Sequence, residues 1–380
     1  MTLSPISLAI SGDAPGSWTE LTLFRFGPPD ARRKVYLQAG MHADEQPGML
    51  ILHHLLPLLA QAEAEGRLSA RFSVVPMANP LGMAHVLHRT HMGRYDLGTG
   101  VNHNRRWPDL FAMIGETVAP LLGADPKANI AAIRNAIAEW LDTQSPASAG
   151  QQMRLALLRE AHDADYVLDL HCDDEALPHI FTAPECAAPM HKLAGWMGGA
   201  YTLTAADSGG FSFDEMLPQL FRLLAKAHPD KPIPIQPVAA TLEYRGRADT
   251  FDALAQKDAE GLIGFFVGEG LIAADPVTLP EPAPAPLPLD ATEIVRVDAP
   301  GLVAYRVGLG DRVKKGDIIA DLVALSGPEA FIARTPIRAG TDGIIISRLT
   351  QKYARRGTSI AKIVGETPLP GRVGGYLLED

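Results

Sequence analysis

Residues 34–45, KVYLQAGMHADE, decide the fold because an apolar strand runs directly into a polar turn. The segment MLILHHLLPLL over 49–59 follows with the apolar density of a helix. A strand that passes into a helix ends at the carboxyl edge of an α/β sheet, where ligands bind. His42 and Glu45, three residues apart at this bend, could therefore point at one cation. The alternative for this pair alone is an ordinary polar loop.

The same alternation of strand and helix continues to about residue 270. Further strands are predicted at 71–80, 166–170 and 234–245, and further helices at 128–142, 151–162 and 249–270. Pro57 removes one backbone hydrogen bond from the first helix, so a kink or a break is expected there. This order predicts an α/β fold in which helices flank a parallel or mixed sheet.

A proline-rich stretch divides the chain into two domains. Residues 275–290, DPVTLPEPAPAPLPLD, alternate proline with small or apolar residues. Proline fixes φ and lacks the amide donor, so this stretch predicts an extended linker and neither a helix nor a central strand. The linker separates a first domain at 1–274 from a second at 291–380. Short valine- and isoleucine-rich segments between glycine turns predict that the second is a small β domain.

Composition excludes several classes of protein. The 380 residues carry a formal net charge of −10, which argues against the basic surface that nucleic-acid-binding proteins have. No run approaches the ~18 apolar residues that a membrane helix needs. The N-terminal segment MTLSPISLAISGD has no basic region of the secretory kind, and two cysteines make no disulfide framework. We therefore expect a cytoplasmic protein without nucleic-acid or membrane partners.

A second polar motif ends another predicted strand. In YVLDLH over 166–171, Asp169 and His171 lie two residues apart and share one strand face. His171 could complete a His/Glu/His site, in which three protein ligands leave one zinc position open for water. The alternative is a solvated histidine at a strand end. Because zinc-bound histidines usually donate their other N–H to a carboxylate or carbonyl, Asp169 is predicted to hold His171 in place.

A carboxylate lies late in the predicted strand 234–245. Thr241, Glu243 and Arg245 are expected to share one face of this strand. A carboxylate in a buried strand is unusual. Glu243 therefore either pairs with Arg245 or Arg247, or it works as a general base.

Arginines concentrate in one part of this acidic chain. Arg89 and Arg94 precede the motif NRRWP at 104–108, which begins with Asn104 and Arg105. Arginine binds carboxylates bidentately through its planar fork. This cluster is either a carboxylate-binding site or a solvated basic loop.

These motifs follow one order: GMHADE at 40–45, NP at 79–80, RY at 94–95, NRRWP at 104–108, DLH at 169–171, then Glu243. That order resembles the succinylglutamate desuccinylase/aspartoacylase family, a branch of the zinc carboxypeptidase-like hydrolases. The resemblance spans about residues 34–270. It implies a mixed sheet flanked by helices, with one zinc ion at the sheet edge.

The resemblance also implies a role for each matched residue. His42, Glu45 and His171 match the ligands of one Zn²⁺ per chain, and Glu243 matches the residue that activates water. Asn104 and Arg105 match the pair that grips the substrate carboxylate. Arg94 matches the arginine that polarises the scissile carbonyl. Segment 96–103 is longer than in aspartoacylase, so Arg89 is the alternative for this last role.

The activity that the resemblance implies is hydrolysis of the N-acyl amide bond of a small N-acyl amino acid or a related carboxylate. A metallocarboxypeptidase, an esterase and a non-catalytic metal- or ligand-binding module are the alternatives. Glu243 beside three ligand residues favours an enzyme, because a binding protein needs no base. The expected partner is the small-molecule carboxylate, and a homo-oligomer is left open.

The C-terminal segment resembles biotinyl/lipoyl-like barrel-sandwich modules in its glycine spacing, with glycines at 308, 310, 316, 340 and 343. Those modules present a lysine at a tight hairpin, whereas the corresponding turn SGPEA at 326–330 has none. A covalently attached cofactor is therefore not expected. Because family members often place such a domain beside the active site, a similar position is expected here.

Overall fold

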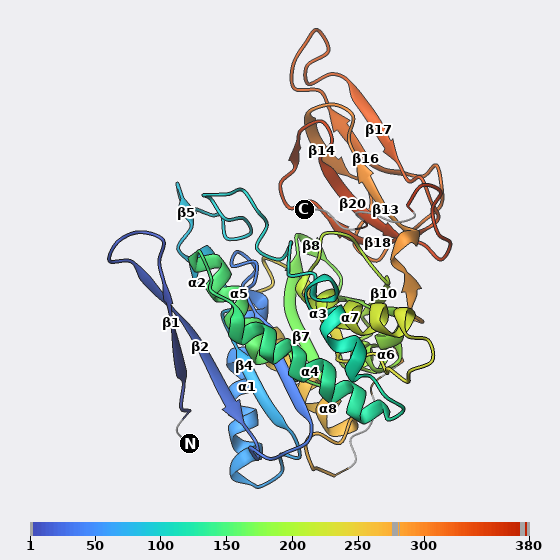
Figure 1. Cartoon of the computed structure of the whole chain (residues 1–380). Coiled ribbons are helices and arrows are strands. Elements are labelled where there is room, and N and C mark those ends of the chain that lie inside the picture. The colour runs from blue at the N-terminus through green and yellow to red at the C-terminus, as the bar shows by residue number, and fades with distance from the viewer. Residues whose placement is uncertain (1–2, 276–279, 281, 373–376, 378–380) are drawn as a thin grey trace.

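A nine-stranded mixed sheet forms the centre of the computed structural model, which describes residues 3–275, 280, 282–372 and 377 (Figure 1). Its strands, in spatial order, are β1 (Ile6–Ser11), β2 (Trp18–Phe26), β4 (Arg71–Val75), β3 (Lys34–Ala39), β7 (Tyr166–Asp173), β11 (Val238–Gly246), β9 (His179–Thr182), β10 (Tyr201–Thr204) and β12 (Leu287–Pro288). The central strands β4, β3, β7 and β11 are parallel, whereas β11 and β9 are antiparallel. The predicted mixed α/β fold is confirmed.

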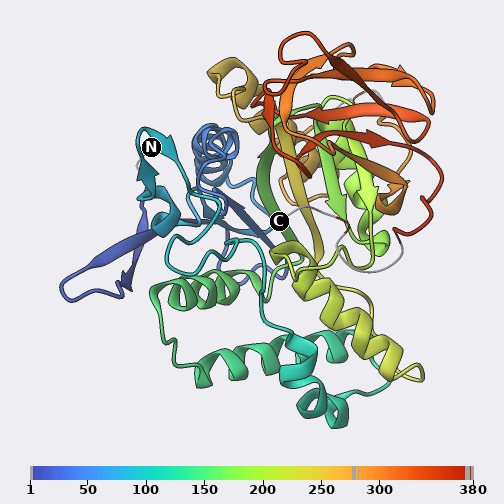
Figure 2. The same ribbon diagram turned by 90° about the horizontal axis from the view of Figure 1, so that it is seen from above.

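Helices cover both faces of the sheet (Figures 1 and 2). One face packs against α1 (Pro47–Ala64), α6 (Ala187–Trp196) and α8 (Asp252–Gly268). The other packs against α3 (Leu110–Val118), α4 (Pro126–Thr143), α5 (Ala149–Ala161) and α7 (Phe213–Ala227). Successive strand residues point to opposite faces, so on β3 Leu37 joins the first core and Tyr36 the second. The sheet is thus buried between two apolar layers.

Several elements differ from the sequence-based expectation. Helix α1 continues through Pro57 without a break. The strand predicted at 71–80 ends at Val75, because Asn79 caps the short helix α2 (Pro80–Met83) by accepting from the N–H of Gly82. A small hairpin of β5 (Val86–Leu87) and β6 (Thr90–His91) follows. The strands β1, β2, β9 and β10 and the helices α3, α6 and α7 were not predicted.

The C-terminal region contains two packed β-sheets around their own apolar core. The first consists of β13 (Thr292–Arg296), β20 (Ser359–Val364), β18 (Gly343–Arg348) and β15 (Arg312–Val313). The second consists of β17 (Arg334–Arg338), β16 (Ile318–Val323), β14 (Gly301–Tyr305) and β19 (Tyr353–Ala354). Strand β8 (Glu175–Ala176), which follows β7, pairs with β18 and joins this region to the large sheet.

The proline-rich stretch 275–290 contributes to the large sheet at its edge. Its strand β12 pairs in parallel with β10 at the edge of the sheet, where a proline is tolerated. Residues 276–279 and 281 of this predicted linker lie outside the described residues.

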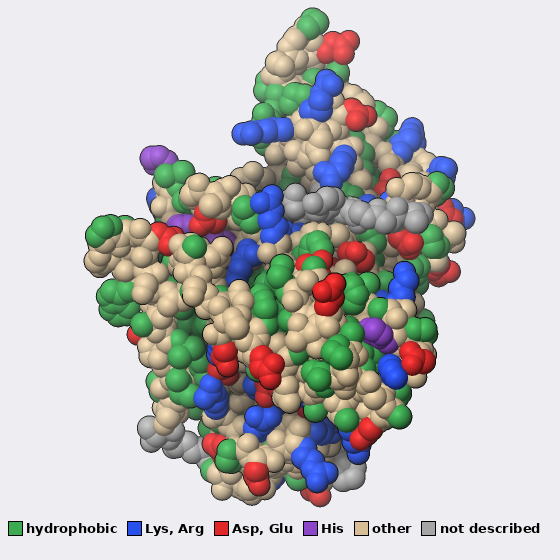
Figure 3. Space-filling view, in the orientation of Figure 1, with side chains coloured by type: hydrophobic (Ala, Val, Ile, Leu, Met, Phe, Trp, Pro, Cys, Tyr) green, Lys and Arg blue, Asp and Glu red, His purple; other side chains and the backbone are tan. Residues whose placement is uncertain are grey.

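The surface carries charges of both signs. On the face shown in Figure 3, acidic and basic side chains are interspersed with apolar ones over the large domain. No helix of the described chain combines the length and apolar character needed to cross a bilayer.

Candidate metal centre and active site

Three potential metal ligands meet at the carboxyl end of the sheet. The turn after β3 carries His42 and Glu45, and the parallel neighbour β7 carries His171. One ring nitrogen of each histidine and a carboxylate oxygen of Glu45 lie within 4.8 Å of one another. All three side chains are buried. The structure thus brings together the three residues that the strand-end motifs singled out.

Asn102 holds the imidazole of His42 in one tautomer. The backbone N–H of Asn104 donates to Asn102 Oδ1 over 2.9 Å, so this oxygen is an acceptor. His42 Nε2 lies 2.8 Å from the same oxygen and must therefore donate to it. The lone pair on His42 Nδ1 then faces Glu45 Oε1, which is 3.0 Å away. His42 Nδ1 and Glu45 Oε1 are both acceptors and repel each other at this distance. A cation or a hydrogen-bond donor that contacts both atoms would relieve this repulsion.

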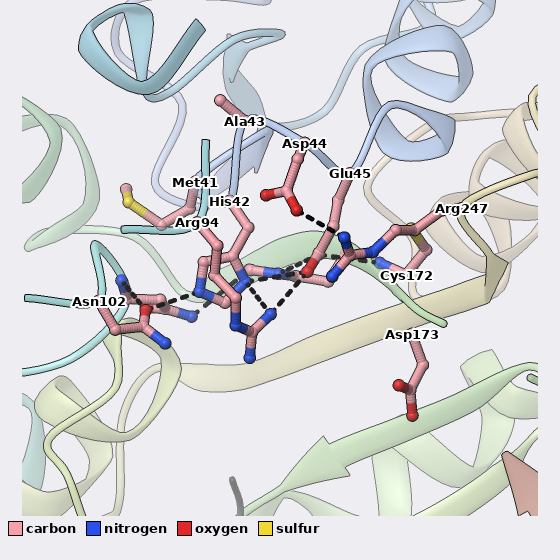
Figure 4. A network of polar contacts seen from close by, with 12 residues as sticks. Met41, His42, Ala43, Asp44, Glu45, Arg94, Asn102, Cys172, Asp173 and Arg247 are labelled. Carbon is pink, nitrogen blue, oxygen red and sulfur yellow. Dashed lines mark hydrogen bonds and ion pairs between the residues drawn. The ribbon is translucent and has the colours of Figure 1, made fainter. Parts of the chain in front are cut away.

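Arg94 supplies positive charge at this point (Figure 4). Its Nη1 donates to Glu45 Oε1 over 2.9 Å and lies 3.1 Å from His42 Nδ1. The guanidinium therefore bridges the two acceptors from the side of the cavity. A cationic side chain thus lies against both of these ligand-type atoms.

The second histidine is held in the same way from its own strand. His171 Nδ1 lies 2.8 Å from Glu45 Oε2, while its Nε2 lies 3.0 Å from Asp169 Oδ2. Asp169 is fully buried on the strand face that it shares with His171. The backbone N–H of Cys172 donates to Glu45 Oε2 over 3.2 Å and fixes the carboxylate. Both imidazoles therefore turn Nδ1 toward one carboxylate.

Burial and neighbouring charges set the protonation of the cluster. Burial, reinforced by Arg94, lowers the pKa of His42 to about 3, so the ring is neutral at pH 7. Burial alone would raise the pKa of Glu45, but the two histidines outweigh it and hold that pKa well below its usual range. Burial alone would lower the pKa of His171, but Asp169 and Glu45 outweigh it and raise that pKa.

The donor set fits a metal ion. Two imidazole nitrogens and one carboxylate oxygen are the protein ligands of many catalytic zinc sites. An oxygen acceptor lies beside the other ring nitrogen of each histidine, Asn102 for His42 and Asp169 for His171, as is usual for metal-bound histidines. The cluster is therefore suited by its chemistry to hold a divalent cation.

Glu243 lies beside this cluster on the neighbouring strand. In the register of β11 and β7, Glu243 pairs with His171. The side chain lines the same cavity as the three ligand-type residues, and its Oε2 is buried without a hydrogen-bond partner among the described residues. Burial, followed by the charge of Glu45, raises the pKa of Glu243 to about 8. This carboxyl group can therefore carry a proton near neutral pH.

The two arginines considered as partners of Glu243 pair elsewhere. Arg245 has a φ of 65°, at a β-bulge between Glu243 and Gly246, and its guanidinium pairs with Asp258 of α8. The expectation that Arg245 shares a face with Glu243 was wrong, because a bulge breaks the two-residue alternation. Arg247 donates to Asp44 over 2.7 Å.

The predicted carboxylate-binding pair occupies the loop beside His171. Asn104 Oδ1 accepts from the N–H of Phe213 at the start of α7 and from Trp107 Nε1. Asn104 Nδ2 is thereby turned toward His171 Nε2, at 3.4 Å. Arg105 is buried and lines the cavity, and its guanidinium also donates to the carbonyl of Asn104 over 3.0 Å.

The two candidates for the carbonyl-polarising arginine occupy different places. Arg94 lines the cavity and contacts the ligand cluster. Arg89 is exposed at the tip of the β5–β6 hairpin, has a φ of 68°, and does not line the cavity. The geometry therefore favours Arg94.

The cavity has a volume of about 250 Å³ and also contains residues that the sequence patterns did not single out. Asp214, Glu215 and Lys362 line it, and Lys362 comes from the C-terminal region. Asn102, which orients His42, was also missed. Its position two residues before Asn104 in the same loop was the only available signal.

Comparison with known proteins finds a family model that matches part of the chain. The model of the succinylglutamate desuccinylase/aspartoacylase catalytic domain matches residues 31–115. This segment contains His42, Glu45, Arg94, Asn104 and Arg105. No curated protein is significantly similar to the sequence.

Solved structures agree with this match over nearly the whole chain. A protein assigned to the succinylglutamate desuccinylase/aspartoacylase family from Shewanella amazonensis is 25% identical, with a TM-score of 0.80 over 95% of this chain and 98% of that one. The product-bound ectoine utilization protein from Ruegeria pomeroyi is 20% identical, with a TM-score of 0.60 over 95% of this chain and 94% of that one. The resemblance to this family of hydrolases is therefore confirmed.

Proposed function

We propose, from the premise of this family resemblance, that the chain is a zinc-dependent hydrolase that removes the acyl group from a small N-acyl amino acid or a related carboxylate. The observation that carries the proposal is the carboxylate of Glu243, whose Oε2 is buried without a hydrogen-bond partner among the described residues, in one cavity with a His/Glu/His cluster. A protein that only stores or senses a metal needs no such group.

The cluster would hold the metal through His42, Glu45 and His171. Zinc, when bound in such a site, acidifies water and polarises a carbonyl group. Asn102 and Asp169 keep Nδ1 of each histidine directed at the cluster centre, which orders the ligands before the metal arrives.

Glu243 is proposed to move the proton. Its free Oε2 accepts a proton from the attacking water and returns it to the amine that leaves. The raised pKa suits this role, because a carboxyl group that titrates near neutral pH can both accept and release a proton there. Its rigid place on β11, opposite His171, fixes the proton acceptor beside the ligand cluster.

The arginines are proposed to orient and polarise the substrate. Arg105 and the Nδ2 group of Asn104 bind the substrate carboxylate, because both are donors at the wall of the cavity. Arg94, which already donates to Glu45 Oε1, stabilises negative charge on the carbonyl oxygen as the amide is attacked.

Small substrates fit this cavity better than peptides. A cavity of about 250 Å³, lined in part by Lys362 of the C-terminal region, suits a small molecule better than an extended chain. This disfavours a metallocarboxypeptidase. An ester of the same acid remains an alternative substrate, because the same groups serve both bonds.

The proposed compartment is the cytoplasm. Cys172 and Cys186 are both buried and free of disulfide bonds, which suits a reducing compartment.

The decisive experiment combines metal analysis with a substrate panel. Purified protein is expected to contain one zinc ion per chain and, when loaded, to hydrolyse some N-acyl amino acids in a panel that varies the acyl group and the amine. Removal of the metal by a chelator is expected to abolish turnover, and added zinc to restore it. Stoichiometric zinc without hydrolysis of any amide or ester in the panel would instead favour a binding module.

A further inference from the structure

The cavity extends beyond the groups that the proposed reaction uses. His171 lies on β7, Thr241 on β11, Phe181 on β9 and Leu203 on β10, and all four line the cavity. These strands are consecutive neighbours in the sheet. Because neighbouring strands lie ~4.8 Å apart, the strands that line the cavity span roughly 14 Å, counted from the strand that carries His171. We call the part between Phe181, Leu203 and α7 the side lobe.

The side lobe has apolar walls. Phe181, Leu203, Ala205 and Leu289 line it, and three of them are at most 8% exposed. Such walls contact methylene groups favourably and offer nothing to a polar stem. A substrate group that enters the lobe must therefore begin with an aliphatic chain.

The first turn of α7 adds two carboxylates to the wall of the cavity. Asp214 accepts a hydrogen bond from the hydroxyl of Ser212, and Glu215 Oε1 accepts from the backbone N–H of Ser208. Both side chains line the cavity. In the described part of the chain, neither carboxylate forms an ion pair, and Arg222, whose charge acts on Glu215, pairs with Glu185 instead.

Ser208 provides an independent indication of a ligand. The residue is 2% exposed and lines the cavity, yet its Oγ has no hydrogen-bond partner among the described residues. A buried hydroxyl group without a partner is costly unless a ligand or water completes it. Its neighbour Glu215 has a pKa raised to about 7, first by burial and then by Asp214, and a bound cation would return that carboxyl to its charged form.

We propose that the side lobe binds a terminal ammonium group, and that the substrate is an Nα-acyl derivative of an amino acid with an amine at the end of an aliphatic side chain. This rests on the proposed deacylase function. An ammonium group has three donors and no acceptor. It can therefore donate to the carboxylate of Glu215 and to the hydroxyl oxygen of Ser208, which are both acceptors. The methylene stem lies against Phe181 and Leu203, while the α-carboxylate lies at Arg105.

The same arrangement selects against acidic side chains. A second carboxylate in the side lobe would meet Asp214 and Glu215 and be repelled by both. N-acyl derivatives of aspartate and glutamate are therefore expected to be poorer substrates than those of lysine or ornithine.

The test compares two substrates of equal shape. Nα-acetylornithine and Nα-acetylnorleucine differ in the exchange of a terminal ammonium for a methyl group. For the zinc-loaded wild type, kcat/KM is expected to be at least about tenfold higher for the ornithine derivative, as a paired charge in a desolvated site requires. Glu215→Gln keeps an oxygen acceptor for the Ser208 N–H and should remove this preference. Asp207→Asn, which neutralises an exposed carboxylate outside the lining, should keep it.

Binding of the free amino acids provides a readout that does not depend on turnover. Calorimetric titration should show ornithine binding at least about tenfold more tightly than norleucine to the wild type and to Asp207→Asn, but not to Glu215→Gln. Equal affinities in the wild type, or equal losses for both ligands in Glu215→Gln, would overturn the ammonium site. Selective binding of ornithine without hydrolysis of any acyl derivative would instead retain the site and reject the proposed deacylase.

Discussion

Two carboxylates in one cavity, Glu45 and Glu243, are given opposite character by their contacts. Glu45 faces two histidines and Arg94, and its pKa is held low in spite of burial. No hydrogen bond of this kind reaches Oε2 of Glu243 among the described residues, so burial, followed by the charge of Glu45, raises its pKa to about 8. One group therefore stays ionised and suits a ligand, while the other can exchange a proton. The two residues are of the same type, so the difference between their roles comes from their surroundings.

The role proposed for Glu243 leads to a prediction about turnover. Glu243→Gln preserves the size of the side chain and removes its basicity, so metal content should stay at one ion per chain. The kcat should fall by ~10²–10⁴-fold, the usual contribution of a general base. Metal analysis and steady-state kinetics check both parts. An unchanged kcat would show that Glu243 is structural.

Asn102 leads to a prediction about metal affinity. Its Oδ1 accepts from His42 Nε2 and from the Asn104 N–H, so Asn102→Ala removes the group that fixes the ring. Zinc affinity should fall by ~10–100-fold, measured by competition with a chelator. Asn102→Asp keeps an oxygen acceptor at the same place and should lose much less. Equal losses in both variants would show that the acceptor does not orient His42.

At the scale of residues, the sequence revealed contacts between strand ends and missed contacts made through loops. His42, Glu45 and His171 could be grouped because parallel neighbours such as β3 and β7 end at one sheet edge. Asn102 reaches His42 from a loop 60 positions further along the chain, whose path no periodicity describes. The pattern also could not rank Arg94 against Arg89, which depends on the fold of the same region.

At the scale of elements, strong patterns were predictable and irregularities were not. The helix at α7 could have been found, since Phe213, Met216, Leu217, Leu220 and Phe221 follow the helical period and are all buried. The bulge in β11 could not, because the sequence of the strand alternates normally through Arg245. This bulge turns Arg245 to Asp258 and places Arg247 beside Asp44.

Gly246, at the end of the bulge, leads to a prediction about stability. A Cβ built on it would lie 2.5 Å from the carbonyl oxygen of Asp174, so the segment after β7 would have to move. Gly246→Ala should lower the free energy of unfolding by about 1–3 kcal/mol, the usual cost of overpacking. Denaturant titration measures this change. Gly268→Ala, at the last position of α8 with no atom near its Cβ, should instead be neutral or stabilising.

At the scale of the whole molecule, the strand that carries the candidate ligand His171 continues into the contact with the C-terminal region. Asp173, two residues after His171, pairs with Lys362 at 2.6 Å. Glu175, two residues further along, pairs with Arg348 at 2.9 Å. Strand β8 adds backbone pairing with β18 (Figure 1). The β character of this region was predictable from its glycine and valine pattern. Its docking was not, because it depends on pairs of charges more than 170 positions apart.

The pair of Asp173 and Lys362 leads to a prediction about pH. Burial alone would raise the pKa of Asp173, but Lys362 outweighs it and holds that pKa well below its ordinary value of 3.8. A group whose pKa is lower in the folded state stabilises the fold above its unfolded pKa and loses that contribution as pH falls. The contribution should therefore be complete at pH 7 and should decline below about pH 4.

Lys362→Met isolates this contribution. Because both side chains are less than one-fifth exposed, the variant should lose about 1–3 kcal/mol of unfolding free energy at pH 7. Its difference from the wild type should shrink in acid, because Asp173 becomes protonated in the unfolded state of both proteins and in the folded variant, which lacks Lys362 to keep the carboxylate ionised. Lys314→Met, which removes an exposed lysine of the same region, should show no such difference at either pH. Denaturant titrations at pH 7 and below pH 4 measure these changes. If the difference in unfolding free energy between Lys362→Met and the wild type is the same at both pH values, Lys362 stabilises the fold by packing and not by its charge.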